Sequence, residues 1–381
     1  MPDVKKRPFF VSQTSMSTNE NLMDVTSTTN EIPSQFYFAC RNNDIELVRR
    51  LLDEHPLEDL DQMELNGSTA LHAACYYKHI DIIKLLLDRG FTRCVLNKYN
   101  NTPFDEGQTE EIQQLFIRPK TSNRFGGGDL SDEQEKLKWI ILDGNEQNII
   151  QDRIPDTYHG NRLEYGIFHG DKILQQLGTN MPKTDVIQRL FHRAMNEKDC
   201  TRLIQAYTAE TDFYNRINNY LISQNNQKNV ISEFVDTIHF NHQLHEKYSF
   251  QGICYRTMNI TSENDLDIYK IGTKIMNRIF ISATKDHQFI EQYANERNKN
   301  NKYTIIISFE IRHHKTALDI EYLSEFSHEK EVLIMNNSIF KIIRISTKNN
   351  FNIEIEVRES KSTRVNKKDK QNSVFGIFHF K

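Results

Sequence analysis

The sequence predicts a multidomain protein: an all-α repeat region, followed by an α+β domain with N-terminal helices flanking two packed β-sheets. Three observations predict this architecture. Helical segments near the N-terminus share a pattern that recurs at a fixed spacing, helical periodicity dominates again from Lys183, and short strand-like runs dominate after Phe250. Helices followed by strands within one stretch are typical of a single α+β domain.

Length and composition fit a globular protein of two or three domains. The 381 residues are 38% hydrophobic and 26% charged, with a net charge of -4, so no basic domain suggests a nucleic-acid partner. The N-terminus lacks a secretory apolar core, and no run approaches the roughly 18 apolar residues of a membrane-spanning helix. We therefore expect a cytoplasmic protein that could also enter the nucleus, without membrane contact. Scattered cysteines without a CxxC pair indicate reduced thiols: Cys40, Cys75, Cys94, Cys200 and Cys254.

The repeat region is expected at residues 32–117. Within STALHAACYYKHIDIIKLLLDRG, apolar residues at i, i+3 and i+4 form one helix face: Ile82, Leu85 and Leu86. Thr69 and Thr102 lie 33 positions apart and begin Thr-Ala-Leu and Thr-Pro-Phe. This period and start resemble the ankyrin repeat; an ordinary helical hairpin bundle is the alternative. The resemblance implies a concave surface for a protein partner, and so short an array is expected to pack against something beyond it.

Four other segments have a composition that differs from the two folded regions. Residues 1–31, rich in Ser, Thr and Asn, are predicted to be disordered. Residues 118–137 contain three consecutive glycines beside a charge run and are predicted to be a linker. Residues 138–182 are unassigned, apart from a possible strand in WIILDG and a short helix in HGDKILQQLG. Residues 359–381 form a basic tail, which is typically solvated, although it could contact acidic lipid or nucleic acid.

Two glutamates stand at the start of an apolar strand in SEFSHEKEVLI. Side chains two apart on a strand share a face, so Glu329 and Glu331 are expected to project together while Lys330 points away. Like charges this close are costly unless a cation binds between them. The alternative is a solvated pair, since charge at a strand edge is common.

Further polar side chains lie within predicted strands. ICYRTM places Arg256 in an apolar strand, where a guanidinium needs a partner or a bound anion. FISATKD places Ser282 and Thr284 at the end of another strand. The chain order Arg256, Ser282, Glu331 resembles the arginine-serine-glutamate signature of the mono-ADP-ribosyltransferases, which include cholera-toxin-like and vertebrate ecto-enzymes. FISAT also resembles the family's F-x-S-T-S, and EKEVLI its E-x-E-V-L-I, within a catalytic domain expected at residues 183–358.

The resemblance implies NAD+ as co-substrate, without a metal. Arg256 would hold the diphosphate of NAD+ through a fork of donors. Ser282 would brace the nicotinamide ribose and Glu331, and Thr284 would support the motif. The glycosidic bond breaks through an oxocarbenium-like state, so Glu331 would stabilise the positive charge that develops on the ribose and bind its 2′-hydroxyl.

On the acceptor side, the resemblance implies transfer of a single ADP-ribose to arginine side chains of target proteins. Glu329 would attract the guanidinium and assist removal of its proton. Phe326, in the preceding loop, is expected to be exposed and to contact the substrate protein. The repeat array would recruit the targets.

Several departures from the family pattern keep alternatives open. Thr257 replaces the usual glycine, Ala283 stands inside the serine motif, and Met335-Asn336-Asn337 replaces Pro-Pro-Gly. The alternatives are an adaptor with an inactive transferase-like domain, or an NAD glycohydrolase. A poly-ADP-ribose polymerase is disfavoured because Arg256 stands where that group has histidine. Three histidines, His239, His242 and His245, recur at every third position. A solvated helix face is the favoured interpretation, and a metal site is disfavoured.

Overall fold

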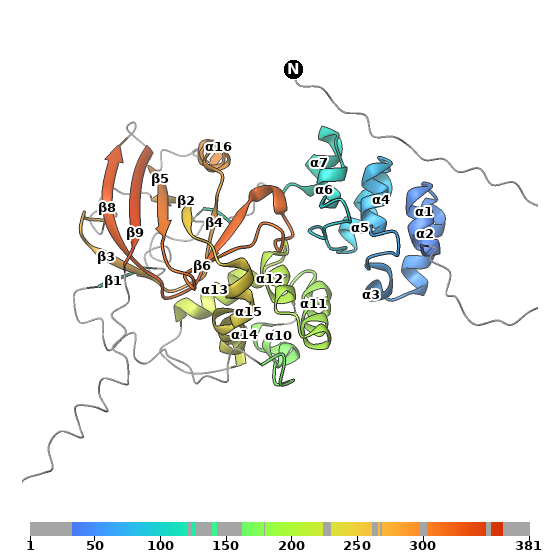
Figure 1. Ribbon diagram of the computed structural model, residues 1–381, viewed down its shortest axis with the longest axis horizontal. Helices are drawn as coiled ribbons and strands as arrows, with labels where there is room; N and C mark the ends of the chain where they lie inside the picture. Colours follow the sequence, from blue (N-terminus) through green and yellow to red (C-terminus); the bar gives the residue numbers. More distant parts are fainter. Residues whose placement is uncertain are drawn as a thin grey trace, which may run out of the picture.

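The repeat region and the α+β domain are both present and lie side by side (Figure 1). The computed structural model describes residues 33–119, 124–126, 139–142, 162–178, 180–223, 230–260, 266, 269–297, 303–347 and 352–360. The predicted disordered segment 1–31 lies outside these residues, as does the basic tail beyond residue 360.

Short antiparallel helix pairs build the repeat region and enclose one apolar core. Threonines begin the second and third units: the Thr69 hydroxyl accepts a hydrogen bond from the backbone N–H of His72, and Thr102 does the same with Asp105. Each is a capping box, which satisfies backbone donors at a helix start and explains the recurring threonine. The helices are α1 (Gln35–Arg41), α2 (Ile45–Glu54), α3 (Leu57–Leu60), α4 (Ala70–Tyr76), α5 (Ile80–Asp88), α6 (Pro103–Glu106) and α7 (Glu110–Phe116).

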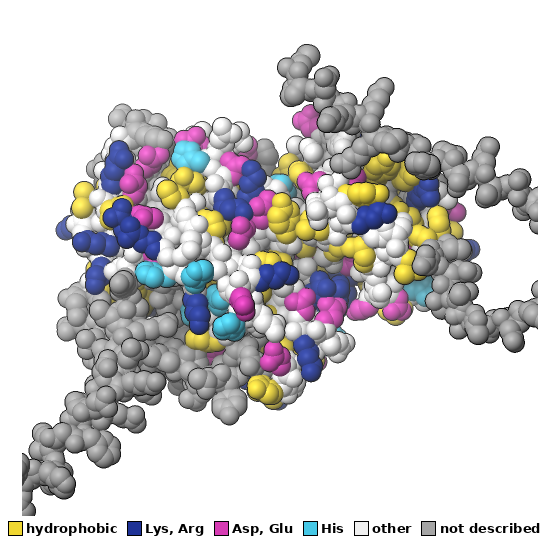
Figure 2. Space-filling model, in the orientation of Figure 1, with side chains coloured by type: hydrophobic (Ala, Val, Ile, Leu, Met, Phe, Trp, Pro, Cys, Tyr) yellow, Lys and Arg dark blue, Asp and Glu magenta, His cyan; other side chains and the backbone are white. Residues whose placement is uncertain are grey.

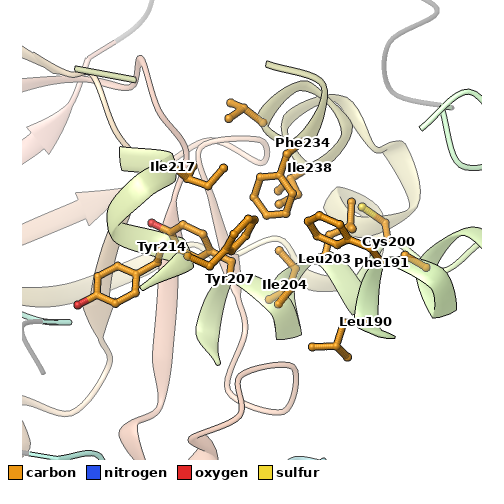
Figure 3. Packing of buried hydrophobic residues seen from close by; sticks show 14 of the residues in the cluster. Leu190, Phe191, Cys200, Leu203, Ile204, Tyr207, Tyr214, Ile217, Phe234 and Ile238 are labelled. Carbon is orange, nitrogen blue, oxygen red and sulfur yellow. The ribbon is translucent and has the colours of Figure 1, made fainter. Parts of the chain in front are cut away.

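A group of helices packs against strand residues of the α+β domain and shares one apolar core with them. Aromatic rings fill its centre, where Phe234 lies 5.1 Å from Phe213 and 6.0 Å from Phe191, centroid to centroid. Tyr207 and Tyr214 lie at one side of this cluster (Figure 3). The helices are α10 (Gly170–Leu177), α11 (Thr184–Glu197), α12 (Thr201–Thr208), α13 (Phe213–Ser223), α14 (Val230–Phe240), α15 (His242–Tyr248) and, beside the strands, α16 (His287–Arg297).

The strands form one hydrogen-bonded sheet of nine in the order β1-β3-β8-β9-β5-β2-β4-β7-β6, where two packed sheets were expected. Only β5 and β9 pair in parallel among these strands. The α+β prediction is confirmed. The strands are β1 (Trp139–Leu142), β2 (Gly252–Ile260), β3 (Lys274–Asn277), β4 (Ile281–Thr284), β5 (Tyr303–Ile311), β6 (Ala317–Asp319), β7 (Glu331–Ile334), β8 (Ile339–Thr347) and β9 (Asn352–Glu359).

The sheet nearly divides between β2 and β4. These strands share one residue pair, Tyr255 with Thr284, whereas β2 pairs with β5 along its whole length. Thr284 also pairs with Glu331 on β7. The three strands that carry the candidate catalytic residues are therefore neighbours, and they meet where the sheet is least tightly joined.

The unassigned region 138–182 belongs structurally to the α+β domain. Its strand β1 pairs with β3 from Trp139 to Leu142, and Ile173 and Leu174 of α10 enter the aromatic-rich helical core. The possible strand and short helix at these positions are both present. The core of this domain therefore includes residues before Lys183, where the sequence analysis placed its start.

The repeat region packs directly on the α+β domain, as expected for so short an array. Asp61 accepts a hydrogen bond from Arg189 Nη1 at 3.2 Å, and both side chains are buried. The Arg93 backbone N–H donates to Glu325 Oε2 at 3.0 Å, and Gln205 Nε2 lies 3.2 Å from Cys94 Sγ. Arg189 and Gln205 lie on α11 and α12, the helices nearest the repeats (Figure 1).

Candidate active site

Strands β2 and β4 bring Arg256 and Ser282 together. Arg256 Nη1 donates a hydrogen bond to the Ser282 carbonyl oxygen at 2.8 Å. At the end of β4, the Thr284 hydroxyl donates to the carbonyl oxygen of Glu329, which lies just before β7, at 2.8 Å and accepts from the Asp286 N–H. Thr284 thus fixes the turn that presents the first glutamate.

The two glutamates are not arranged as same-face neighbours on one strand, which corrects the sequence prediction. Glu329 ends a 3₁₀ turn, Ser327–Glu329, and β7 begins only at Glu331. Lys330 between them has φ 47°, in the left-handed region, and its ammonium lies 2.9 Å from Asp286 at the surface. The chain therefore bends between the two carboxylates. Both are buried, with 3% of Glu329 and 0% of Glu331 exposed.

The hydroxyl that reaches Glu331 belongs to Ser324, which the sequence analysis did not single out. Ser324 Oγ donates to Glu331 Oε2 at 3.1 Å and accepts from the Phe326 N–H at 3.2 Å. Ser282 was expected to brace this carboxylate, but its described contact is the bond from Arg256 to its carbonyl. Ser324 lies in the loop that was expected to meet the substrate, which was the only sequence signal for it.

An arginine outside the expected catalytic domain pairs with Glu331. Arg124 Nε donates to Glu331 Oε1 at 2.9 Å, and Nη2 lies 2.8 Å from the same oxygen, with both side chains fully buried. The guanidinium carbon lies 4.5 Å from the ring centroid of Tyr207 and 5.1 Å from that of Tyr214. Arg124 is therefore held by one carboxylate and two aromatic faces, a favourable setting for a desolvated cation.

A second arginine pairs with Glu329. Arg118 Nε and Nη2 each donate to one oxygen of the Glu329 carboxylate, at 3.0 Å in both cases, and Nη1 donates to Glu210 at 2.8 Å. Burial acts to lower the pKa of Arg118, but Glu329 and Glu210 more than offset it, so the net pKa is raised. The guanidinium is therefore charged and makes a bidentate contact with the acceptor-side glutamate.

Phe326 is buried, with 2% of its surface exposed, and this corrects the expectation of an exposed aromatic. The Arg118 guanidinium carbon lies 3.7 Å from its ring centroid, and that of Arg93 lies 5.1 Å away. Two cations from the N-terminal half of the chain thus cover the ring. Phe326 contacts a guanidinium in this structure, and that guanidinium belongs to the same chain.

Residues predicted to form a linker are instead buried in the candidate site. Arg256 Nη1 donates to the Arg124 carbonyl oxygen at 2.9 Å, and Thr257 donates to the Phe125 carbonyl from both its N–H and its hydroxyl, each at 2.9 Å. Phe125 is 0% exposed. We name Arg118 and Arg124–Gly126 the covering segment. The linker prediction followed the glycines and missed the two arginines and the phenylalanine ahead of them.

The other departures from the family pattern are structural. Ala283 and Met335 are buried in the core, and Asn336 Oδ1 lies 3.1 Å from His239 Nδ1. His245 Nε2 contacts the His239 carbonyl oxygen at 2.8 Å. These histidines serve the local fold, and among described residues the side chains close enough to share a cation are a different set: His287, Glu291 and Glu354.

Comparison with known proteins identifies the families of the two regions. The family model described as NAD:arginine ADP-ribosyltransferase matches residues 182–364. Residues 182–364 belong to this family. The ankyrin-repeat model matches residues 36–107 in three copies. The protein is therefore an ankyrin-repeat array joined to an ADP-ribosyltransferase domain, and the expected resemblance to both families is confirmed.

Individual relatives are distant. Alpha-latrotoxin-Lg1a of Latrodectus geometricus is 31% identical over 134 residues, a match that spans 34% of this chain and 9% of the toxin. Vis toxin, an ADP-ribosyltransferase of Vibrio splendidus, is 17% identical, with a TM-score of 0.36 over 52% of this chain and 89% of that chain. ADP-ribosyltransferase HopU1 of Pseudomonas syringae is 18% identical, with a TM-score of 0.36 over 46% and 86%. No described helix combines the length and apolarity needed to cross a bilayer.

Proposed function

We propose that this protein transfers a single ADP-ribose from NAD+ to arginine side chains of target proteins and releases nicotinamide. The observation that carries the arginine specificity is the bidentate contact between Glu329 and a guanidinium, that of Arg118. The side chains that already hold this group, with Phe326 against its face, have the chemistry to bind an arginine of another protein.

The donor half of the reaction falls to Arg256 and Glu331. The Arg256 guanidinium is suited to the diphosphate of NAD+, since it offers a rigid fork of donors. The bond between ribose C1′ and the nicotinamide nitrogen breaks with its electron pair going to nicotinamide, which leaves neutral. Positive charge then develops on the ribose, and the Glu331 carboxylate, oriented by Ser324, stabilises it.

The acceptor half falls to Glu329. A guanidinium nitrogen of the target arginine attacks ribose C1′ and loses a proton, for which the Glu329 carboxylate is the base. The bonds that Arg118 makes to Glu329 and Glu210 indicate how that arginine would be oriented. Without an acceptor, water would attack C1′ instead, and the enzyme would act as an NAD glycohydrolase.

We also propose that the repeat array recruits target proteins. Large apolar side chains are exposed on its turns and at the end of α4, and Figure 2 shows hydrophobic surface over the repeat region. The exposed residues are Met63, Leu65, Tyr76, Tyr77 and Tyr99. Aromatic side chains are typical anchors of protein interfaces.

The test is incubation with labelled NAD+ and agmatine, a small guanidine. Because Arg124 covers Glu331, the assay uses both the wild-type chain and Phe125→Ala, a variant that retains the predicted catalytic side chains. Glu331→Gln should lower both NAD+ cleavage and agmatine labelling by about a hundredfold or more. Glu329→Gln should lower labelling by about a hundredfold while NAD+ cleavage continues. Cleavage without labelling in every variant would identify a glycohydrolase, and NAD+ consumption independent of Glu331 would refute the proposal.

A further inference from the structure

We propose that the covering segment is an internal pseudosubstrate: it occupies both the NAD+ and the acceptor subsites and keeps the full chain latent until it is displaced. This inference rests on the proposed function. Arg118 and Arg124–Gly126 contact Glu329, Glu331, Arg256 and Thr257 at once.

One residue, Arg124, blocks the donor subsite by contacting both Arg256 and Glu331. The carbonyl oxygen of Arg124 accepts a hydrogen bond from Arg256, and its guanidinium donates one to Glu331. Arg256 donates a further, longer bond to the Gly126 carbonyl oxygen at 3.4 Å. The groups expected to bind the diphosphate and to stabilise the ribose are therefore already committed. Since Glu331 is 0% exposed, NAD+ cannot reach it while Arg124 stays in place.

The acceptor subsite is filled by a group of the same chemistry as the proposed substrate. Arg118 presents a charged guanidinium to Glu329 and Glu210 and stacks against Phe326. Arg118 is nevertheless not positioned to be modified in this state, because Arg124 fills the place from which the ribose would be transferred. An arginine that binds the acceptor carboxylate while NAD+ is excluded occupies the acceptor subsite without reacting, and it therefore acts as an inhibitor.

Phe125 and Gly126, the residues that follow Arg124, fit closely against the transferase domain, which distinguishes the covering segment from a chain that merely lies across a cleft. Phe125 packs edge-on against Phe289 and Tyr293, at centroid distances of 5.4 and 6.0 Å. A Cβ added at Gly126 would lie 3.1 Å from the Thr257 hydroxyl, so the glycine permits the close approach. Thr257, which replaces the glycine usual in the family, donates two hydrogen bonds to the Phe125 carbonyl. The departure at Thr257, which left an inactive domain open as an alternative, thus serves to hold the covering segment.

The repeat array is placed to control release. Helix α7 ends at Phe116, two residues before Arg118. Phe104 of the neighbouring helix α6 stacks on His328, with a ring-centroid distance of 4.9 Å, and His328 directly precedes Glu329 in the sequence. A partner that draws the array away from the transferase domain would therefore withdraw Arg118 first.

Steady-state kinetics in NAD+ test the inference, because a segment that competes with NAD+ raises its KM without changing kcat. Arg124→Ala and, more gently, Phe125→Ala should lower the KM for NAD+ at least about tenfold at unchanged kcat, since only the released form binds. Arg50→Ala, at an exposed arginine of the repeat region, is the control and should leave KM unchanged. Phe125→Ala touches neither carboxylate, so it remains informative where Arg124→Ala fails to fold.

Three results would overturn the inference. A raised KM in both variants would make the segment part of the NAD+ site, an unchanged KM would mean that it blocks nothing, and ADP-ribose found on Arg118 by mass spectrometry would make it a substrate. Failure of the proposed function looks different, because no variant would then show turnover that depends on Glu331. In that case, calorimetric titration with NAD+ decides the inference: Phe125→Ala should bind at least about tenfold more tightly than the wild-type chain, and equal binding would refute it.

Discussion

The N-terminal half of the chain touches the transferase domain in two regions that look alike and differ in meaning. In the docking region, Asp61 pairs with Arg189, and Arg93 meets Glu325. In the covering segment, two arginines pair with Glu329 and Glu331. Both regions bury charge, which gives little net stability compared with apolar packing but is strongly destabilising when one partner is lost.

The difference lies in which carboxylates are used. Neither Asp61 nor Glu325 has a place in the proposed chemistry, whereas Glu329 and Glu331 are the residues proposed to act on the acceptor and the ribose. Loss of a docking pair should therefore weaken the protein without a direct effect on catalysis. Loss of a covering residue should release activity, since a buried ion pair can act as a switch between two states.

Arg189→Ala should give the largest effect on stability. It leaves Asp61 buried without its cation, and the cost is about 3–5 kcal/mol in the free energy of unfolding, measured by urea titration. Arg50→Ala removes an exposed pair with Glu54 and should cost at most about 1 kcal/mol. If both variants lost similar stability, the buried pair of the docking region would contribute no more than an exposed pair.

The parts of the site that could be predicted from the sequence are those fixed within single strands. Arg256, Ser282 and Glu331 stand out as polar side chains in predicted strands, and their order along the chain resembles the family signature. The ankyrin array was predicted from two similar segments whose threonines, Thr69 and Thr102, lie 33 positions apart. Local pattern and global fold agree at these positions.

The remainder depends on contacts between distant parts of the chain. Arg118 meets Glu329 across 211 positions and Arg124 meets Glu331 across 207, and no periodicity encodes such pairs. Phe326 looked exposed because its neighbours are polar, yet Arg93 and Arg118 cover it. The bend at Lys330 was missed because a left-handed lysine is uncommon and has no sequence signature.

Thr257→Val should sharpen the contrast with a smaller effect. Valine keeps the shape but removes the hydroxyl that donates to the Phe125 carbonyl, a bond worth about 0.5–1.5 kcal/mol. The KM for NAD+ should fall by roughly twofold to tenfold at constant kcat. Thr237→Val is the matched control, since that buried hydroxyl donates to the Glu233 carbonyl within α14, and its KM should not change. Equal KM values for NAD+ in the two variants would show that the Thr257 hydroxyl does not help to hold the covering segment in place.

The smallest effect concerns pH and His328. Burial, followed by the charges of Arg118 and Arg93, lowers the pKa of His328 to about 4 in the closed form. Release would return its pKa toward roughly 6.5. The released form then binds the extra proton as the pH falls from about 6.5 toward 4, so acid favours release.

The KM for NAD+ in the wild-type chain should therefore fall by up to about tenfold between pH 7 and pH 5.5, relative to the same change in His328→Asn. The comparison between the two proteins isolates the imidazole, because both retain the neighbouring Arg93, Arg118, Glu325 and Glu329, whose own titration affects them alike. If the two KM profiles run parallel across this range, His328 does not sense the release of the covering segment. A steeper fall in the wild type alone would make this histidine, stacked on Phe104 of the repeat array, the point at which docking and covering are linked.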